Sequence, residues 1–195
     1  MTKRIIKRYE YILENLLFED ENMKLYLARR KDRLLSFREY LNESTYLSDL
    51  DKYRRLQKAG INVPKLIGFD RQLLILIFER FFEPTALEVL EKEDLKEIYF
   101  RQLFSIYRFC RFSQIEINYF PHNFILKGMT LYYIGDDIFE ADPKINLENY
   151  GLRYWIYSEE ASKLLDEKGY SVNPKRILSE EETNKQIVLL SVTYW

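Results

Sequence analysis

The stretch Ile115–Asp137, IEINYFPHNFILKGMTLYYIGDD, decides how the rest of the chain is interpreted. Two short apolar runs, 124–127 and 131–134, are separated by a turn at Gly128, which predicts two strands joined by a tight turn. Such a hairpin returns Asp136, which follows the second run, to the neighbourhood of Asn123, which precedes the first. An amide and a carboxylate brought to one place predict a site for phosphate and a metal ion.

Composition limits the classes of protein to which the chain can belong. Its 195 residues are 47% hydrophobic, which is enough for a buried core in one compact domain or one domain of two lobes. Thirty Lys and Arg against 31 Asp and Glu give a net charge of -1, so no overall charge favours nucleic acid or an anionic membrane. One cysteine and one histidine exclude an internal disulfide and disfavour a structural zinc site.

The apolar runs also bear on localisation. The longest central run, Leu73–Phe78, is far too short to span a bilayer, and residues 1–14 lack the apolar segment of a signal peptide. We therefore expect a soluble, cytoplasmic protein without a membrane span.

The first part of the chain predicts a β-rich region with one helix. Three runs rich in aromatic and aliphatic residues predict an antiparallel meander, and they cover residues 9–18, 23–29 and 33–41. Apolar spacing predicts a helix over 44–59, with Ser48 and Asp51 at capping-box spacing and Gly60 as its stop. Residues 61–70 are interpreted as a loop that enters a strand, and 73–78 as a fully apolar strand.

The second part predicts mainly helices. We expect a short helix over 85–90, a long one over 94–113 and a third over 154–168 that Gly169 stops. Leu95, Tyr99, Leu103, Ile106 and Cys110 form the buried stripe expected for the long helix. The apolar tail at 187–195 requires a surface to pack on.

This order of elements, with the spacing of the polar residues in the central stretch, resembles the protein-kinase-like fold. In that family a catalytic Asp is followed five positions later by a metal-binding Asn, and a second metal-binding Asp opens the next motif. Asn118 stands at the position of the catalytic Asp, Asn123 matches the metal-binding Asn, and Asp136 matches the second metal ligand. The resemblance covers roughly residues 9–170 and implies ATP and Mg²⁺ as ligands.

The resemblance also assigns residues in the first part of the chain. It places Arg38 at the position of the family's phosphate-binding Lys, with Asp49 or Asp51 as its helix carboxylate. The segment from Glu79 to Phe81 corresponds to the hinge beside the adenine. The family's glycine-rich phosphate loop is absent, because the acidic turn at 19–22 occupies its place.

We accordingly predict an α+β, two-lobed protein-kinase-like fold. Residues 1–82 would form an N-terminal lobe with an antiparallel sheet and one helix, and residues 83–195 a reduced, mainly helical C-terminal lobe. Among known members, the length and the loose motifs look most like small bacterial ones. These are the lipopolysaccharide-core kinases and the short family named for a PhoP regulatory network protein.

Asn118 separates the functional alternatives, because an amide cannot accept a proton as a carboxylate does. The leading hypothesis is a nucleotide-binding pseudokinase with a regulatory role, whose partner is another protein. An active ATP-dependent phosphotransferase with a sugar or lipopolysaccharide-core acceptor is the second, in which Glu116 or His122 could replace the base. The third is a protein-binding module that has lost the nucleotide.

Overall fold

The chain divides into two compact units, which are described separately. The computed structural model describes residues 2–142 and 144–195. The N-terminal unit contains the residues up to Arg55 together with Val63–Phe82, and the C-terminal unit contains Leu56–Asn62 and Glu83–Trp195. No helix within the described residues is both long enough and apolar enough to cross a membrane.

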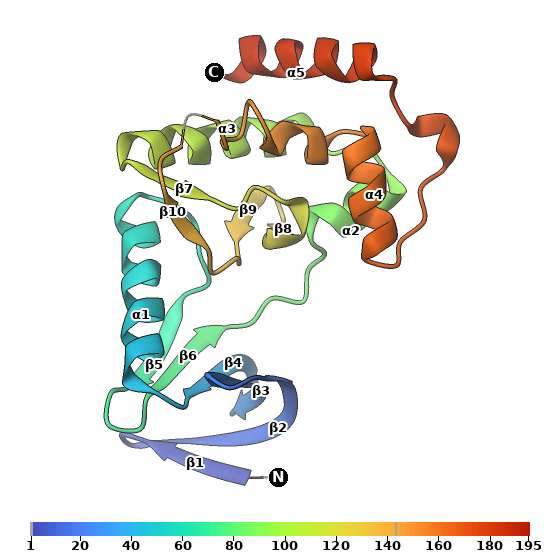
Figure 1. Cartoon of the computed structure of the whole chain (residues 1–195). Helices are drawn as coiled ribbons and strands as arrows, with labels where there is room; N and C mark the ends of the chain where they lie inside the picture. The colour runs from blue at the N-terminus through green and yellow to red at the C-terminus, as the bar shows by residue number, and fades with distance from the viewer. Residues whose placement is uncertain (1, 143) are drawn as a thin grey trace. The chain divides into compact units, whose positions relative to one another are not determined.

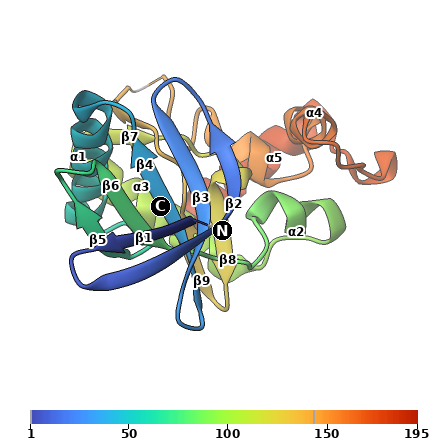
Figure 2. The same ribbon diagram turned by 90° about the horizontal axis from the view of Figure 1, so that it is seen from below.

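The N-terminal unit is built on an antiparallel six-stranded sheet (Figures 1 and 2). Its strands run in the order β1-β2-β3-β4-β6-β5 across the sheet. Their bounds are β1 Thr2–Ile6, β2 Tyr9–Glu19, β3 Met23–Arg30, β4 Arg33–Tyr40, β5 Leu66–Asp70 and β6 Ile75–Glu79. The three runs predicted as a meander are β2, β3 and β4. The register of β3 with β4 is continuous from Met23↔Tyr40 to Arg30↔Arg33, whereas that of β2 with β3 shifts twice along β2.

Strand β1 is not among the strands that the sequence pattern predicts. It pairs with β2 from Thr2↔Leu13 to Ile6↔Tyr9 and so extends the sheet at one edge. Basic residues interrupt its short apolar content, and only Ile6 is buried. The strand is therefore fixed by pairing with β2 and not by a hydrophobic pattern of its own.

Alternation along the strands builds a core on each face of the sheet. Leu35 and Phe37 of β4 lie on one face with Tyr11, Ile75 and Ile77, while Ser36 and Arg38 point the other way. Full burial of a side chain of this size contributes about 1.5–3 kcal/mol.

Helix α1, Glu43–Lys58, covers the second face (Figure 1). Its residues Tyr46, Leu50 and Tyr53 pack against Leu76 and Phe78 of β6. The helix begins within one residue of its predicted start at Ser44, but the predicted Ser48–Asp51 capping box lies inside it. Asn42 supplies the cap instead, because its side-chain oxygen accepts a hydrogen bond from the Thr45 amide at 2.8 Å.

The C-terminal unit combines helices with two small β-ribbons (Figure 1). One ribbon pairs β7, Ile115–Ile117, with β10, Ile138–Glu140, and the other pairs β8, Phe124–Lys127, with β9, Thr130–Tyr133. The helices are α2 Ala86–Lys92, α3 Glu97–Phe112, α4 Glu159–Glu167 and α5 Glu180–Tyr194, with short 3-10 helices η1 Pro121–Asn123, η2 Gly151–Trp155 and η3 Pro174–Arg176.

Helix α3 is the centre of this unit. Four of the residues predicted for its buried stripe lie inside the helix and are buried, and the fifth, Leu95, is buried just before it. Cys110 is fully buried, and burial raises the pKa of its thiol to about 12, as expected for a core cysteine.

The two C-terminal helices differ from the predicted ones. The helix expected over 154–168 is shorter, because Ser158 caps α4 by accepting a hydrogen bond from the Ala161 amide at 3.1 Å. The apolar tail forms the last turns of α5, where the Tyr194 ring packs on Phe104 of α3. Arg108 of α3 also donates a hydrogen bond to the Tyr194 carbonyl at 2.6 Å.

Candidate functional site

The central loop of the C-terminal unit holds the two predicted amides in one local network. The Asn118 side-chain oxygen accepts a hydrogen bond from the Phe120 amide at 3.1 Å, which makes a tight turn after β7. The Asn123 side-chain nitrogen donates to the Asn118 carbonyl oxygen at 3.3 Å, across the single turn of η1. The two ends of the loop are therefore tied together.

The hairpin β8–β9 carries Asp136 back toward this loop, as its spacing predicts. Phe124 is paired with Tyr133, and one step further the Ile134 amide donates to the Asn123 carbonyl at 2.8 Å. Asp136 follows two residues after Ile134 and is exposed. The two proposed metal ligands thus leave adjacent strands on the same end of one hairpin.

Buried Tyr133 fixes the backbone that leads to Asp136. Its hydroxyl donates to the Asp137 carbonyl at 3.0 Å, and burial raises its pKa well above the usual range of a tyrosine. A Cβ atom at Gly135 would lie 2.6 Å from this hydroxyl oxygen, which is closer than atoms can approach. Gly135 is required here because the backbone passes directly over the Tyr133 ring.

The chemistry of these donors fits a magnesium ion that is bound together with phosphate. Because the Asn123 nitrogen is used in the loop, its amide oxygen is the atom that can ligate a cation. The carboxylate of Asp136 is a second oxygen donor, and Mg²⁺ usually takes one or two such protein ligands and completes its shell with phosphates and water. No group of three or more His, Cys, Asp or Glu that could hold a metal alone occurs in the described residues.

Arg38 and its carboxylate lie within the N-terminal unit. Arg38 projects from β4, and its Nη1 atom lies 3.7 Å from the Oδ2 atom of Asp49 on α1. Asp51, the alternative partner, is exposed. The Tyr40 hydroxyl donates to the same Asp49 oxygen at 3.0 Å, and Lys52 lies 3.7 Å from the other.

The remaining predicted positions lie where β6, an inner strand of the same sheet, ends. Glu79 is the last residue of β6, where its amide donates to the Lys65 carbonyl at 2.8 Å, and Phe81 follows the strand half-buried. Asp20 closes the acidic turn between β2 and β3. Its side chain accepts hydrogen bonds from the backbone amides of Asn22 and Met23, each at 2.8 Å. A carboxylate thus occupies the inside of this turn.

The two alternative bases are both held by packing. His122 stacks on the Phe120 ring with 5.7 Å between ring centroids, and burial, followed by the charge of Lys168, lowers its pKa. Glu116 is 3% exposed on β7 and lines a cavity whose walls include none of Asn118, Asn123 and Asp136. The sequence does not predict this cavity, because its walls come from four separate segments.

Comparison with known proteins bears on the fold. No family model matches the chain, and no curated protein matches it. Among solved structures, the BubR1 kinase domain is 12% identical with a TM-score of 0.50, and 71% of this chain covers 50% of that one. A structure of vaccinia related kinase 3 is 14% identical with a TM-score of 0.43, and 69% of this chain covers 50% of it.

The likeness to the BubR1 kinase domain shows a kinase-like fold, as the sequence resemblance implied. The chain spans half the length of each of these structures. At such low identity the likeness concerns the fold alone.

Proposed function

We propose that the chain is a kinase-like protein that binds ATP or a related nucleotide with Mg²⁺ and acts as a regulatory pseudokinase. The observation that carries the proposal is the Asn123–Ile134 hydrogen bond of 2.8 Å, which sets the amide and the Asp136 segment at one end of the β8–β9 hairpin. The low-identity likeness to a kinase domain supports the same reading of the fold.

Each proposed contact follows from the chemistry of its residue. Asn123 and Asp136 of the C-terminal unit would hold the metal, which when bound neutralises phosphate charge. Arg38 of the N-terminal unit would bind phosphate oxygens through its planar guanidinium, with Asp49 orienting it. Glu79 and Phe81 would flank the adenine, as the family resemblance implies.

Asn118 supports a regulatory role over catalysis. Its side-chain oxygen already accepts a hydrogen bond from the backbone N–H of Phe120. The neutral carboxamide of Asn118 also cannot act as a general base. A positioned base contributes about 100- to 10,000-fold to such a transfer. We therefore propose that the chain binds the nucleotide with little or no turnover. A partner protein would recognise the nucleotide-bound form.

The test is thermal unfolding with and without ATP and Mg²⁺. A ligand that binds only the folded chain stabilises it by about 2.7 kcal/mol at a concentration one hundred times its Kd. We expect a shift that requires the metal and that Asp136→Ala abolishes. Asp137→Ala is the matched control, because Asp137 is also exposed and contributes its backbone carbonyl to the Tyr133 contact.

The outcomes separate the alternatives. An unchanged melting temperature at millimolar ATP and Mg²⁺ would contradict nucleotide binding and leave a protein-binding module with a kinase-like fold. ATP turnover by the unmodified chain, lost in Asp136→Ala and raised in Asn118→Asp, would instead establish the phosphotransferase. A sugar or lipopolysaccharide-core acceptor of the bacterial kinases would then be the first substrate class to assay.

A further inference from the structure

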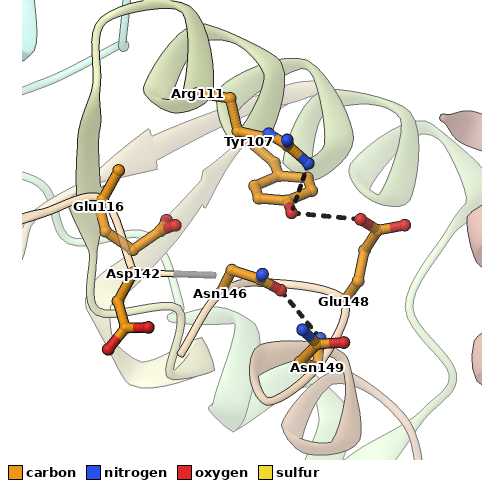
Figure 3. A pocket seen from close by; sticks show the side chains of 8 residues that line it. Tyr107, Arg111, Glu116, Asp142, Asn146, Glu148 and Asn149 are labelled. Atoms are coloured by element: carbon orange, nitrogen blue, oxygen red, sulfur yellow. Dashed lines mark hydrogen bonds between the residues drawn. The ribbon is translucent and has the colours of Figure 1, made fainter. Parts of the chain in front are cut away.

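A cavity of about 390 Å³ lies within the C-terminal unit (Figure 3), and neither of the proposed metal ligands lines it. Its size is within the range of small-molecule sites. Its walls come from the end of α3, from β7, from the segment after β10 and from the turn before η2. The residues that matter for its chemistry are Tyr107, Arg111, Glu116, Asp142, Asn146 and Glu148.

The ionisable side chains of this cavity are mainly acidic. Three carboxylates, those of Glu116, Asp142 and Glu148, face a single guanidinium, that of Arg111. Asp142 is exposed, whereas Glu116 is 3% exposed. The cavity therefore favours a cationic occupant.

Arg111 is held away from a simple pairing with Glu116. It donates to the Tyr107 hydroxyl at 3.5 Å, and its guanidinium lies 5.5 Å from the centre of the Trp195 ring. The Tyr107 hydroxyl in turn donates to Glu148 at 3.1 Å (Figure 3). Arg111 and Glu148 thus share Tyr107, which binds each of them directly.

Glu116 is the member of the cavity whose hydrogen bonding is incomplete. Its Oε1 atom is buried and has no hydrogen-bond partner among the described residues. Figure 3 shows the carboxylate extending from β7 toward Asn146, across the cavity. Burial raises the pKa of Glu116, against the opposing effects of the nearby Tyr119 hydroxyl, the Ile117 backbone and Arg111. A buried carboxylate oxygen without a donor is costly unless a ligand supplies one.

We propose that this cavity binds a small aliphatic amine, whose primary ammonium group donates hydrogen bonds to Glu116. An ammonium group offers three donors and a positive charge, which match an unpartnered carboxylate oxygen. A second amine of the same molecule would meet Asp142. A bare metal ion is disfavoured, because the described residues contain no group of three or more ligating side chains that could hold one.

The experiment is calorimetric titration of the full chain with putrescine and, separately, with spermidine. We expect saturable binding of at least one of them, with Glu116→Gln weakening it about tenfold or more, the effect of losing a charge-assisted hydrogen bond. Asp142→Asn should weaken it less, because that carboxylate is exposed. Glu140→Gln is the matched control, since Glu140 is an exposed carboxylate near the end of β10 that does not line the cavity.

Circular dichroism checks that each variant is folded, and the Gln substitution retains the size of the Glu116 side chain. Equal affinities of the unmodified chain and Glu116→Gln would overturn the proposal, and so would the absence of binding at about 10 mM amine, well above a Kd of 1 mM. Asp136→Ala should bind the amine normally, so that a failed nucleotide site and a failed amine site are distinguishable.

Discussion

Two carboxylates, one in each unit, differ in the partners that surround them in the fold. The Asp49 side chain is 16% exposed and lies 3.7 Å from Arg38, 3.7 Å from Lys52 and 3.0 Å from the Tyr40 hydroxyl. Glu116 is more deeply buried, and its Oε1 atom has no hydrogen-bond partner in the part of the chain that the structure describes. The N-terminal unit pairs its carboxylate with two cations, whereas in the C-terminal unit Arg111, the cation near Glu116, donates its hydrogen bond to Tyr107.

This difference separates a structural role from a binding role. A charge that leaves water loses hydration free energy, and only close partners or protonation compensate for the loss. Asp49 has such partners within the fold, so its pairing holds α1 and the Arg38 guanidinium in place. Glu116 retains an unmet acceptor beside a cavity, which is the condition that a ligand can satisfy.

The largest effect is expected from breaking the satisfied cluster. Asp49→Ala removes the acceptor of the Tyr40 hydroxyl and a partner of two cations, and we expect it to lower the free energy of unfolding by about 2 kcal/mol. Urea unfolding followed by circular dichroism measures the loss. Asp51→Ala, two residues along the same helix and exposed, should stay within about 0.5 kcal/mol. Similar losses in both variants would show that the cluster contributes nothing specific.

Substitution of Glu116 should change the free energy of unfolding in the opposite direction to substitution of Asp49. Glu116→Gln removes a charge that burial disfavours, and we expect it to raise the free energy of unfolding by about 1 kcal/mol at neutral pH. The pH dependence has a definite sign. Because the folded-state pKa of Glu116 is raised, its unfavourable contribution is absent below the unfolded value of about 4.3 and grows as pH rises through the folded value.

Urea unfolding of the unmodified chain and of Glu116→Gln, each at pH 4 and at pH 7, therefore tests this prediction. The advantage of Glu116→Gln should be larger at pH 7 than at pH 4. A constant advantage at both values would trace the effect to packing and not to charge. A saturating concentration of amine should also reduce the difference in the free energy of unfolding between Glu116→Gln and the unmodified chain at pH 7. The amine stabilises the unmodified chain more than the variant.

The sequence predicted those parts of the fold that depend on local patterns. Alternating side chains identified β4 with Phe37 on the core side, and the turn at Gly128 identified the hairpin that returns Asp136. Strand β1 was missed because only pairing with β2 fixes it. The bounds of α1 were predicted to within one residue, but its cap was misassigned, because Ser48 and Asp51 have capping-box spacing whereas Asn42 makes the actual cap.

The cavity could not be predicted, for a different physical reason. In the sequence, Glu116 stands between two isoleucines and has the pattern of a solvent-facing residue on a short strand. The cavity that Glu116 lines is formed with residues up to 33 positions away, among them Tyr107, Asn146 and Asn149, which no local pattern connects. The Arg38 partner was left open between Asp49 and Asp51 for a similar reason, since the rotation of α1 against the sheet decides it.

The smallest expected effect on stability comes from removing the hydroxyl groups of two buried tyrosines, one beside each carboxylate. Tyr40 and Tyr119 are 3% and 5% exposed. The Tyr40 hydroxyl donates to Asp49 at 3.0 Å, whereas the Tyr119 hydroxyl lies near Glu116 and Cys110 but makes no hydrogen bond of ordinary geometry within the described residues. Tyr40→Phe should lower the free energy of unfolding by about 1 kcal/mol, whereas Tyr119→Phe should change it by less than about 0.5 kcal/mol. The urea midpoints of the two variants measure the difference directly, because the atoms removed are the same. A loss at Tyr119 as large as that at Tyr40 would mean that Tyr119 donates to Glu116 in solution, and the carboxylate would then have the partner that we assign to an amine.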